Sequence, residues 1–178
     1  MNFKLIKSDT IFKGKVFDLQ VDEIEYESGN KGIREVAIHQ GGSVIVALTD
    51  DYKIVMVNQF RYPLQRYLYE LPAGKLEQGE DPQVCALREL KEETGYNANS
   101  IIKLGSIVTT PGFCTEMLHI FLAQELTNGD HSREEGEFGM QIIELTLKEI
   151  EDKIKNGDIY DAKTISGIML AKLHLTKS

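Results

Sequence analysis

Cysteine is scarce in this sequence. Cys85 and Cys114 are the two that it contains, and they lie far apart without forming a CxxC pair. A disulfide framework needs an even set of cysteines, and a zinc site needs several thiol or imidazole ligands at short spacing, so neither is indicated. The expected location is a reducing compartment, the cytoplasm.

Long apolar runs are also absent. No stretch approaches the ~18 consecutive apolar residues of a membrane-spanning helix, so no membrane partner is expected. The first nine residues contain neither an apolar core nor a small-residue cleavage site, so we expect no secretory signal there.

Basic residues are outnumbered, with 20 Lys and Arg against 28 Asp and Glu and a formal charge of −8. Nonspecific duplex binding needs basic patches that displace counterions, so no nucleic-acid partner is expected. Hydrophobic residues, in contrast, are plentiful and make up 42% of the 178 residues. That length predicts a single domain, residues 1–178, which buries roughly 70% of its unfolded surface.

Alternating polar and apolar residues predict a strand-rich N-terminal part. Residues 15–39 are interpreted as a hairpin around the turn-forming residues 28–32. Further strands are expected at residues 43–49, 54–59, 67–71, 101–108, 117–123 and 139–145.

Three helices are expected between and after these strands. The first begins at Asp81, with Pro82 at its first turn, and ends at Gly95. The second begins with the capping-box spacing of Thr146 and Glu149. The third follows Asp161 and is expected to place Ile165, Ile168, Met169 and Leu173 on one face. Strands with interspersed helices favour an α/β fold with a mixed sheet.

The first helix carries three glutamates on one stripe. Glu89, Glu92 and Glu93 share a face because residues three and four apart are neighbours on a helix, whereas Val84, Leu87 and Leu90 are expected to pack on a sheet. Like charges at this spacing cost roughly 0.2–0.5 kcal/mol per pair. The stripe is therefore either a solvated acidic face or a set of carboxylates that something neutralises.

The surrounding residues decide between these readings. The chain reads Gly74-x5-Glu80-x7-Arg88-Glu89-Leu90-x-Glu92-Glu93-x-Gly95-Tyr96. This run matches the Nudix signature at every specified position, and its chance occurrence in a chain of this length is on the order of 10⁻⁷ at average residue usage. The chain therefore resembles the Nudix hydrolase superfamily.

The resemblance implies a fold and an assembly. The fold is a Nudix α/β/α sandwich with a mixed β-sheet, formed by residues 41–178 as the catalytic core. Residues 1–40 would form an additional antiparallel sheet that is used in dimerisation, so a homodimer is expected.

The resemblance also implies a metal site. Glu89 and Glu93 would be the principal ligands, together with the backbone carbonyl of Ala73. Glu92 would be a secondary ligand, and Arg88 would pair with Glu80 or Glu92 and orient the set. Mg²⁺, with Mn²⁺ as a substitute, suits such hard oxygen ligands and a diphosphate substrate.

Residues outside the signature resemble the bacterial ADP-ribose pyrophosphatase subgroup. Pro111 follows Tyr96 by fifteen residues, within the run Thr109-Thr110-Pro111-Gly112-Phe113. Residues 59–63, 70–77, 114–123 and 157–164 resemble other segments of that subgroup. The implied reaction is Mg²⁺-dependent hydrolysis of ADP-ribose to AMP and ribose 5-phosphate. Three alternatives are hydrolysis of another nucleoside diphosphate sugar such as GDP-mannose, hydrolysis of nucleoside triphosphates, and a sensor that binds ADP-ribose without cleaving it.

In the subgroup, a loop glutamate beyond the signature acts as the general base. The matching loop is residues 131–138, where Glu137 is the best candidate and Glu135 the second. The sequence departs from the subgroup pattern directly after this loop, at Gly139-Met140-Gln141, so the register of the match stays open by about two residues.

Four further residues match substrate-binding positions of the subgroup. Arg34 and Arg61 would contact the nucleotide and its phosphates, for which the guanidinium group is well suited. Thr110 and Glu116 would lie near a ribose. A surface ion pair or a turn cap is the alternative interpretation of each. Cys85 is not expected to be a nucleophile, because its acidic surroundings disfavour the thiolate.

Overall fold

The computed structural model describes residues 2–129 and 139–176. The chain divides into two compact units. The first unit consists of Met1–Gly41 and Val108–Met117, and the second of Gly42–Ile107 and Leu118–Ser178. The segment Val108–Met117 thus belongs with the N-terminal residues although it follows the signature helix in sequence.

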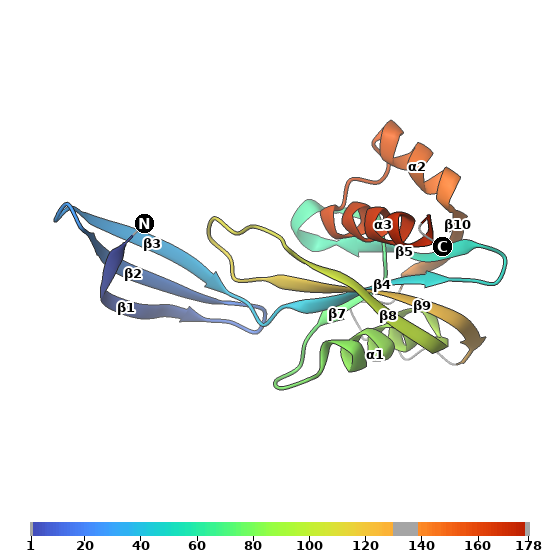
Figure 1. The fold of residues 1–178 in the computed structure, drawn as a ribbon, viewed down its shortest axis with the longest axis horizontal. Coiled ribbons are helices and arrows are strands. Elements are labelled where there is room, and N and C mark those ends of the chain that lie inside the picture. The colour runs from blue at the N-terminus through green and yellow to red at the C-terminus, as the bar shows by residue number, and fades with distance from the viewer. Residues whose placement is uncertain (1, 130–138, 177–178) are drawn as a thin grey trace. The chain divides into compact units, whose positions relative to one another are not determined.

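The first unit contains an antiparallel sheet of three strands, β1 (Phe3–Lys13), β2 (Asp18–Tyr26) and β3 (Lys31–Ile38), in the order β1-β2-β3 (Figure 1). The predicted hairpin is confirmed as β2 and β3. Sequence analysis gave no boundaries for β1, because two register shifts, at Leu5/Lys7 and Thr10/Phe12, interrupt its alternation.

The second unit is built on a mixed sheet. Its described strands follow the order β10-β5-β4-β9-β8, and β6 and β7 pair with β5 and β4. β4 and β9 are parallel, whereas β5 runs antiparallel to β4, β6 and β10. The strands are β4 (Gly42–Leu48), β5 (Lys53–Arg61), β6 (Arg66–Glu70), β7 (Ala73–Lys75), β8 (Tyr96–Val108), β9 (Met117–Asn128) and β10 (Gln141–Thr146), with a short 3-10 helix at Tyr62–Leu64.

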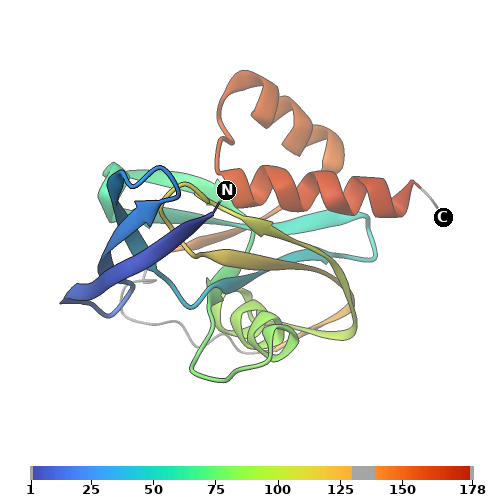
Figure 2. The ribbon, with the colours of Figure 1, turned by 60° about the vertical axis from the view of Figure 1, so that its left-hand side comes forward.

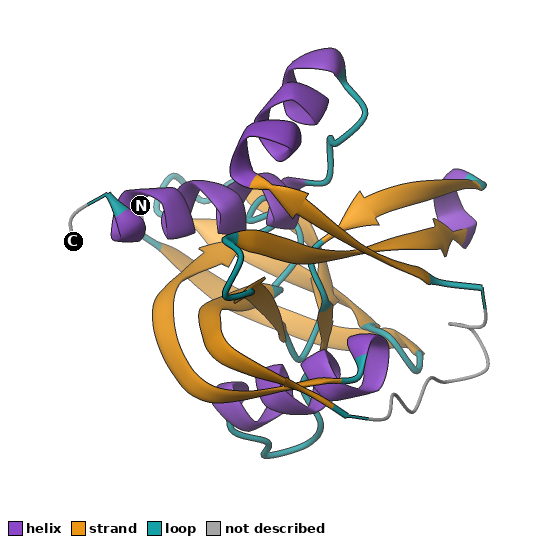
Figure 3. Ribbon diagram, turned by 90° about the vertical axis from the view of Figure 1, so that its right-hand side faces the viewer, coloured by secondary structure: helices purple, strands orange, loops and turns teal. Residues whose placement is uncertain are grey.

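Helices cover both faces of this sheet. α1 (Pro82–Thr94) lies on one face, and α2 (Leu147–Asn156) and α3 (Ala162–Leu175) lie on the other (Figures 2 and 3). β4 is buried along its whole length, and its side chains alternate between two cores. Val44 and Val46 pack with Ile150 and Ile168, whereas Ile45 packs with residues of α1. The predicted α/β/α sandwich is therefore confirmed.

The helix ends follow the predicted capping residues. Asp81 accepts hydrogen bonds from the backbone N–H groups of Gln83 and Val84, and α1 ends at Gly95 with φ of 77°. Thr146 and Glu149 form the capping box of α2. No described helix has both the length and the apolar composition needed to cross a membrane.

Two predicted helix faces are wrong in part. Val84 is exposed on α1, and Met169 and Leu173 are exposed on α3. The inner face of α3 instead combines Ile168 with the smaller residues Thr164, Gly167 and Ala171. The helix lies close to Leu71 at Gly167, where an added Cβ would come within 2.6 Å of the Leu71 side chain. Hydrophobic spacing alone does not show which face of a helix contacts the sheet.

Candidate active site

The glutamates of α1 line a pocket of about 310 Å³ in the second unit. Glu89 and Glu93 are only 8% and 3% exposed, although both carry a carboxylate. Buried carboxylates are rare unless they are paired or bind a cation. The pocket is lined by Gln59, Arg61, Ala73, Gly74, Lys75, Glu77, Arg88, Glu89, Glu92 and Glu93.

Arg88 connects the carboxylates of this pocket. Its guanidinium donates to both oxygens of Glu80, at 2.9 and 3.0 Å, and through Nη1 to Glu89 Oε1 at 2.7 Å and Glu92 Oε2 at 2.9 Å. It also donates to the backbone carbonyl of Lys75. The expected partner of Arg88 was Glu80 or Glu92, and the structure contains both pairs together with a pair to Glu89. These contacts reduce the mutual repulsion of the carboxylates of Glu80, Glu89 and Glu92.

The bidentate contact with Arg88 lowers the pKa of Glu80 from 4.5 to about 2. A folded-state pKa below the ordinary value means that the stabilising contribution is complete above about pH 4.5. It is lost as the pH falls through this range toward 2.

We expect Glu80→Gln to lower the melting temperature at pH 7 and this deficit to shrink between pH 4.5 and 2. Circular dichroism melts of both proteins test this, and a deficit that stays constant down to pH 2 would contradict it.

The strand β7 lies directly against the glutamates. The backbone N–H of Ala73 donates to Glu93 Oε2 at 3.1 Å. At Gly74, an added Cβ would overlap the Glu89 carboxylate, so any other residue there would displace that carboxylate from its position. The residues that resemblance assigned to a metal are therefore together: Glu89, Glu93 and the backbone of Ala73 occupy one wall of the pocket, with Glu92 beside them.

These residues fit a divalent cation. The donor set consists of hard oxygens, and the absence of a side chain at Gly74 leaves room for the Glu89 carboxylate beside the loop backbone. Within the described residues, no three His, Cys, Asp or Glu side chains form a group that could hold a metal ion. Glu89 and Glu93 would supply two of the six oxygens that Mg²⁺ or Mn²⁺ prefers, and backbone carbonyls, water and substrate phosphates are the usual source of the others.

Arg61 lines the same pocket, and its guanidinium is paired with the buried carboxylate of Glu70. Its Nε and Nη2 donate to the two carboxylate oxygens of Glu70 at 2.7 and 2.5 Å. Glu70 is 1% exposed and also pairs with Lys163 of α3. The hydrogen bonds that Arg61 donates to the Glu70 carboxylate raise the pKa of Arg61. Glu70 engages Nε and Nη2, and Arg61 lines the pocket, so the guanidinium has further N–H donors to offer a ligand.

The other predicted substrate contacts lie in the first unit. Arg34 donates to the backbone carbonyl of Ile33 and to the Tyr26 hydroxyl, and its guanidinium lies over the Tyr26 ring. Glu116 lies 3.5 Å from His39 Nδ1. Thr110 accepts backbone hydrogen bonds from Phe113 and Cys114 through its carbonyl.

Glu116 also lines a cavity of about 700 Å³ within the first unit. Most of its other lining residues are apolar, among them Val16, Phe17, Leu19, Ala37 and Phe113. The predicted bases Glu135 and Glu137 lie outside the described residues.

Cys85 is buried beneath the pocket, and burial raises the pKa of its thiol to about 11, with a smaller contribution from Glu80 and Glu89. The expectation of an unreactive thiol is therefore supported, but burial is the main cause. The pocket also contains three residues that were not predicted for it, Gln59, Lys75 and Glu77, although all three lie in the runs 59–63 and 70–77 that carry the resemblance.

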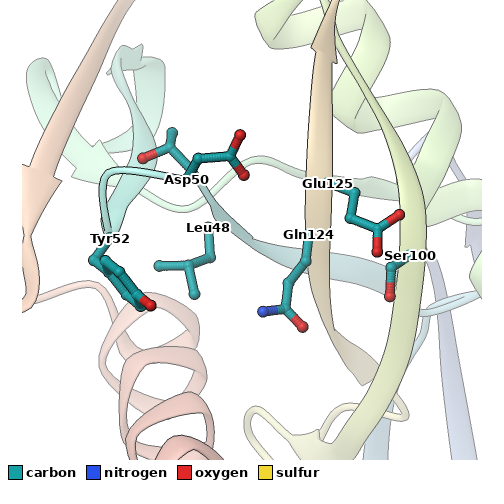
Figure 4. A pocket seen from close by; sticks show the side chains of 7 residues that line it. Leu48, Asp50, Tyr52, Ser100, Gln124 and Glu125 are labelled. Atoms are coloured by element: carbon teal, nitrogen blue, oxygen red, sulfur yellow. The ribbon is translucent and has the colours of Figure 1, made fainter.

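A separate hollow of about 250 Å³ lies beside the β4–β5 turn (Figure 4). Its lining includes Asp50, Glu125, Ser100 and Gln124, and no Arg or Lys is among its described lining residues. Because it offers no positive charge to a diphosphate, this hollow does not compete with the glutamate pocket as a substrate site.

Comparison with known proteins agrees with this geometry. The "NUDIX domain" family model matches residues 39–165. The chain is 45% identical to the ADP-ribose pyrophosphatase of Bacillus subtilis and to the methanol dehydrogenase activator of Bacillus methanolicus, in each case over 96% of this chain and 92% of the relative. It is 31% identical to the GDP-mannose pyrophosphatase of Cronobacter sakazakii over 98% and 96% of the two chains.

A solved structure described as an ADP compounds hydrolase superposes with a TM-score of 0.87. It covers 99% of this chain and 96% of its own, at 18% identity. At this identity the likeness shows that the fold is shared.

Proposed function

We propose that this chain, which belongs to the NUDIX domain family, hydrolyses ADP-ribose to AMP and ribose 5-phosphate with Mg²⁺ as its cation. Divalent metal ions are general in this family. The observation that carries the proposal is the pair of buried carboxylates, Glu89 and Glu93, in a pocket that also contains the arginine Arg61. The name of the 45% identical Bacillus subtilis relative supports ADP-ribose as the substrate.

Charge favours an anionic substrate that arrives with a cation. The pocket lining has four glutamates against two arginines and one lysine, so it is formally negative by one charge. A diphosphate adds further negative charge, which the protein alone would not balance. In the proposed site, Glu89, Glu93 and the carbonyl of Ala73 hold the cation, with Glu92 as a secondary ligand. The cation would supply charge neutralisation at the diphosphate and a more acidic water.

The remaining roles fall to other residues of the chain. Arg61, fixed by Glu70, donates hydrogen bonds to the diphosphate. Arg88 orients Glu89 and Glu92 through the hydrogen bonds described above. Glu137, with Glu135 as the second candidate, accepts the proton of the attacking water. Arg34, Thr110 and Glu116 bind the nucleoside and the sugar.

A substrate panel tests the proposed activity. Purified protein with Mg²⁺ is incubated with ADP-ribose, GDP-mannose, UDP-glucose, diadenosine polyphosphates and dNTPs, and the products are separated by chromatography. We expect the highest kcat/KM with ADP-ribose, with AMP and ribose 5-phosphate as products. A higher value with GDP-mannose or a dNTP would select one of the alternatives, and ADP-ribose binding without turnover of any substrate would indicate a sensor.

We also propose a cytoplasmic homodimer formed through residues 1–40, with Arg34 contributing to the partner's nucleotide pocket and residues 41–178 as the catalytic core. Support comes from β1, all of whose residues are exposed. Its large apolar side chains Phe3, Leu5, Ile11 and Phe12 are among them. An unpaired edge with exposed apolar residues favours association with another chain.

Light scattering of the purified protein at micromolar concentration should give twice the mass of one chain. Deletion of residues 1–13 should give a monomer with much reduced activity on ADP-ribose. A fully active monomeric wild type would rule out the proposed assembly.

A further inference from the structure

Gln59 lies in the wall of the glutamate pocket with an unsatisfied polar atom. Gln59 is 9% exposed as a whole residue, and its side-chain oxygen Oε1 is buried without a hydrogen-bond partner. The other buried side-chain atom of this kind among the described residues is the Thr109 hydroxyl oxygen, in the first unit. A buried polar atom without a partner destabilises a fold, so in a pocket it is a candidate contact for an ion, a water molecule or a ligand.

The strand β5 explains why Gln59 faces the pocket. Side chains alternate along β5: Val55 packs in the core beneath α1, whereas Ile54 and Met56 pack in the core of the opposite face. Gln59 and Arg61 share the face of Val55, and both line the pocket. An apolar residue at position 59 would continue the buried face of the strand and leave no unsatisfied atom. Packing therefore does not account for the amide.

The chemistry of Oε1 selects its partner. An amide oxygen is a hydrogen-bond acceptor, and the diphosphate oxygens of the proposed substrate are acceptors too, so these atoms cannot satisfy each other. Arg61 supplies donors for the diphosphate. The partner of Oε1 is then a cation or a hydrogen-bond donor, such as a hydroxyl group or a water molecule.

The incomplete carboxylate set favours the cation. Mg²⁺ and Mn²⁺ prefer six oxygens, and the proposed set of Glu89, Glu93, the Ala73 carbonyl and Glu92 as a secondary ligand supplies only part of that number. A neutral oxygen from Gln59 adds to the set without adding repulsion between charges. On the premise of the proposed function, we propose that Gln59 supplies a neutral oxygen to the divalent-cation site formed with Glu89 and Glu93.

Gln59→Met tests this, because methionine has a similar volume and replaces the amide by a thioether, a poor ligand for hard cations. Calorimetric titration with MnCl₂, without substrate, should show an affinity about 10-fold lower or weaker still, as for other residues that support a metal site. The melting temperature of the metal-free protein should rise by about 2–4 °C, because an unsatisfied buried polar atom is removed. Gln141→Met, the same change at an exposed position of β10, should alter neither value.

Three results would overturn the proposal. A lower melting temperature with unchanged Mn²⁺ affinity would make Gln59 a structural residue. Unchanged Mn²⁺ affinity with a raised KM for ADP-ribose would identify a substrate hydroxyl as the partner. Unchanged values throughout would leave Gln59 without a role. If Gln59→Met does not fold, Gln59→Glu replaces it. That variant places a charged oxygen at the same position and should bind Mn²⁺ more tightly than the wild type, and equal or weaker binding would refute the assignment.

The two proposals fail separately. The Mn²⁺ titration uses no substrate. If Gln59→Met binds Mn²⁺ more weakly but the wild type does not turn over ADP-ribose, the proposed cation site stands and ADP-ribose is rejected as the substrate. If the wild type turns over ADP-ribose but Gln59→Met binds Mn²⁺ with unchanged affinity, the proposed function stands and the role of Gln59 is rejected.

Discussion

Glu93→Gln is expected to lower kcat on ADP-ribose by at least ~10²-fold, the lower range for a group that stabilises charge in the transition state. Glutamine keeps the size of the side chain and can still accept the hydrogen bond from the Ala73 N–H. The lost property is therefore the negative charge in a nearly buried position. Steady-state kinetics at saturating Mg²⁺ measure the effect, and EDTA should abolish wild-type activity until Mg²⁺ or Mn²⁺ is restored.

Two variants delimit this prediction. Glu151→Gln removes a carboxylate that pairs with Lys172 on the opposite face of the sheet and should leave turnover unchanged. Arg88→Ala should reduce turnover less than Glu93→Gln, because Arg88 orients the carboxylates through hydrogen bonds. Near-normal turnover by Glu93→Gln would contradict the metal assignment, and an equal or larger loss in Arg88→Ala would give that arginine a more direct part.

Glu137→Gln is expected to lower kcat by about 10²–10⁴-fold, the usual contribution of a general base. The substrate dissociation constant should change little, because glutamine preserves the shape of the side chain and the helix glutamates are untouched. Loops that close over a substrate can supply a base from outside the metal-binding helix. Single-turnover kinetics at several concentrations of excess enzyme separate the rate of the chemical step from substrate binding.

Neighbouring glutamates provide the matched controls. Glu134→Gln should be nearly silent. A greater loss in Glu135→Gln than in Glu137→Gln would move the base two residues toward the N-terminus. Unchanged turnover in both variants would mean that the helix glutamates and the cation activate the water without a loop base.

Much of the local structure could be predicted from the sequence because it depends on neighbouring residues. The ends of α1 follow from Asp81, Pro82 and Gly95, and the capping box of α2 follows from Thr146 and Glu149, since caps are formed by side chains within one turn of the backbone. The common face of Glu89, Glu92 and Glu93 follows in the same way from helical periodicity.

Strand β1 and the inner face of α3 show where such patterns stop being informative. Register shifts in β1 interrupt the period of two, and the pairing with β2 that tolerates them is not visible in β1 alone. On α3, Gly167 and not Met169 faces the sheet, and an added Cβ at position 167 would come within 2.6 Å of the Leu71 side chain.

By itself, the sequence determined the family signature, the carboxylate stripe and the Arg88 pairing, because all of these depend on spacing along one helix and the loop before it. Tertiary structure alone decided that Glu70 pairs with both Arg61 and Lys163 and that Gly74 lies against Glu89. It also decided that the Gln59 amide is buried in the pocket wall. These contacts join β5, β6, β7, α1 and α3, and contacts between elements distant in sequence are set by how the sheet and helices pack, which no local pattern of residues encodes.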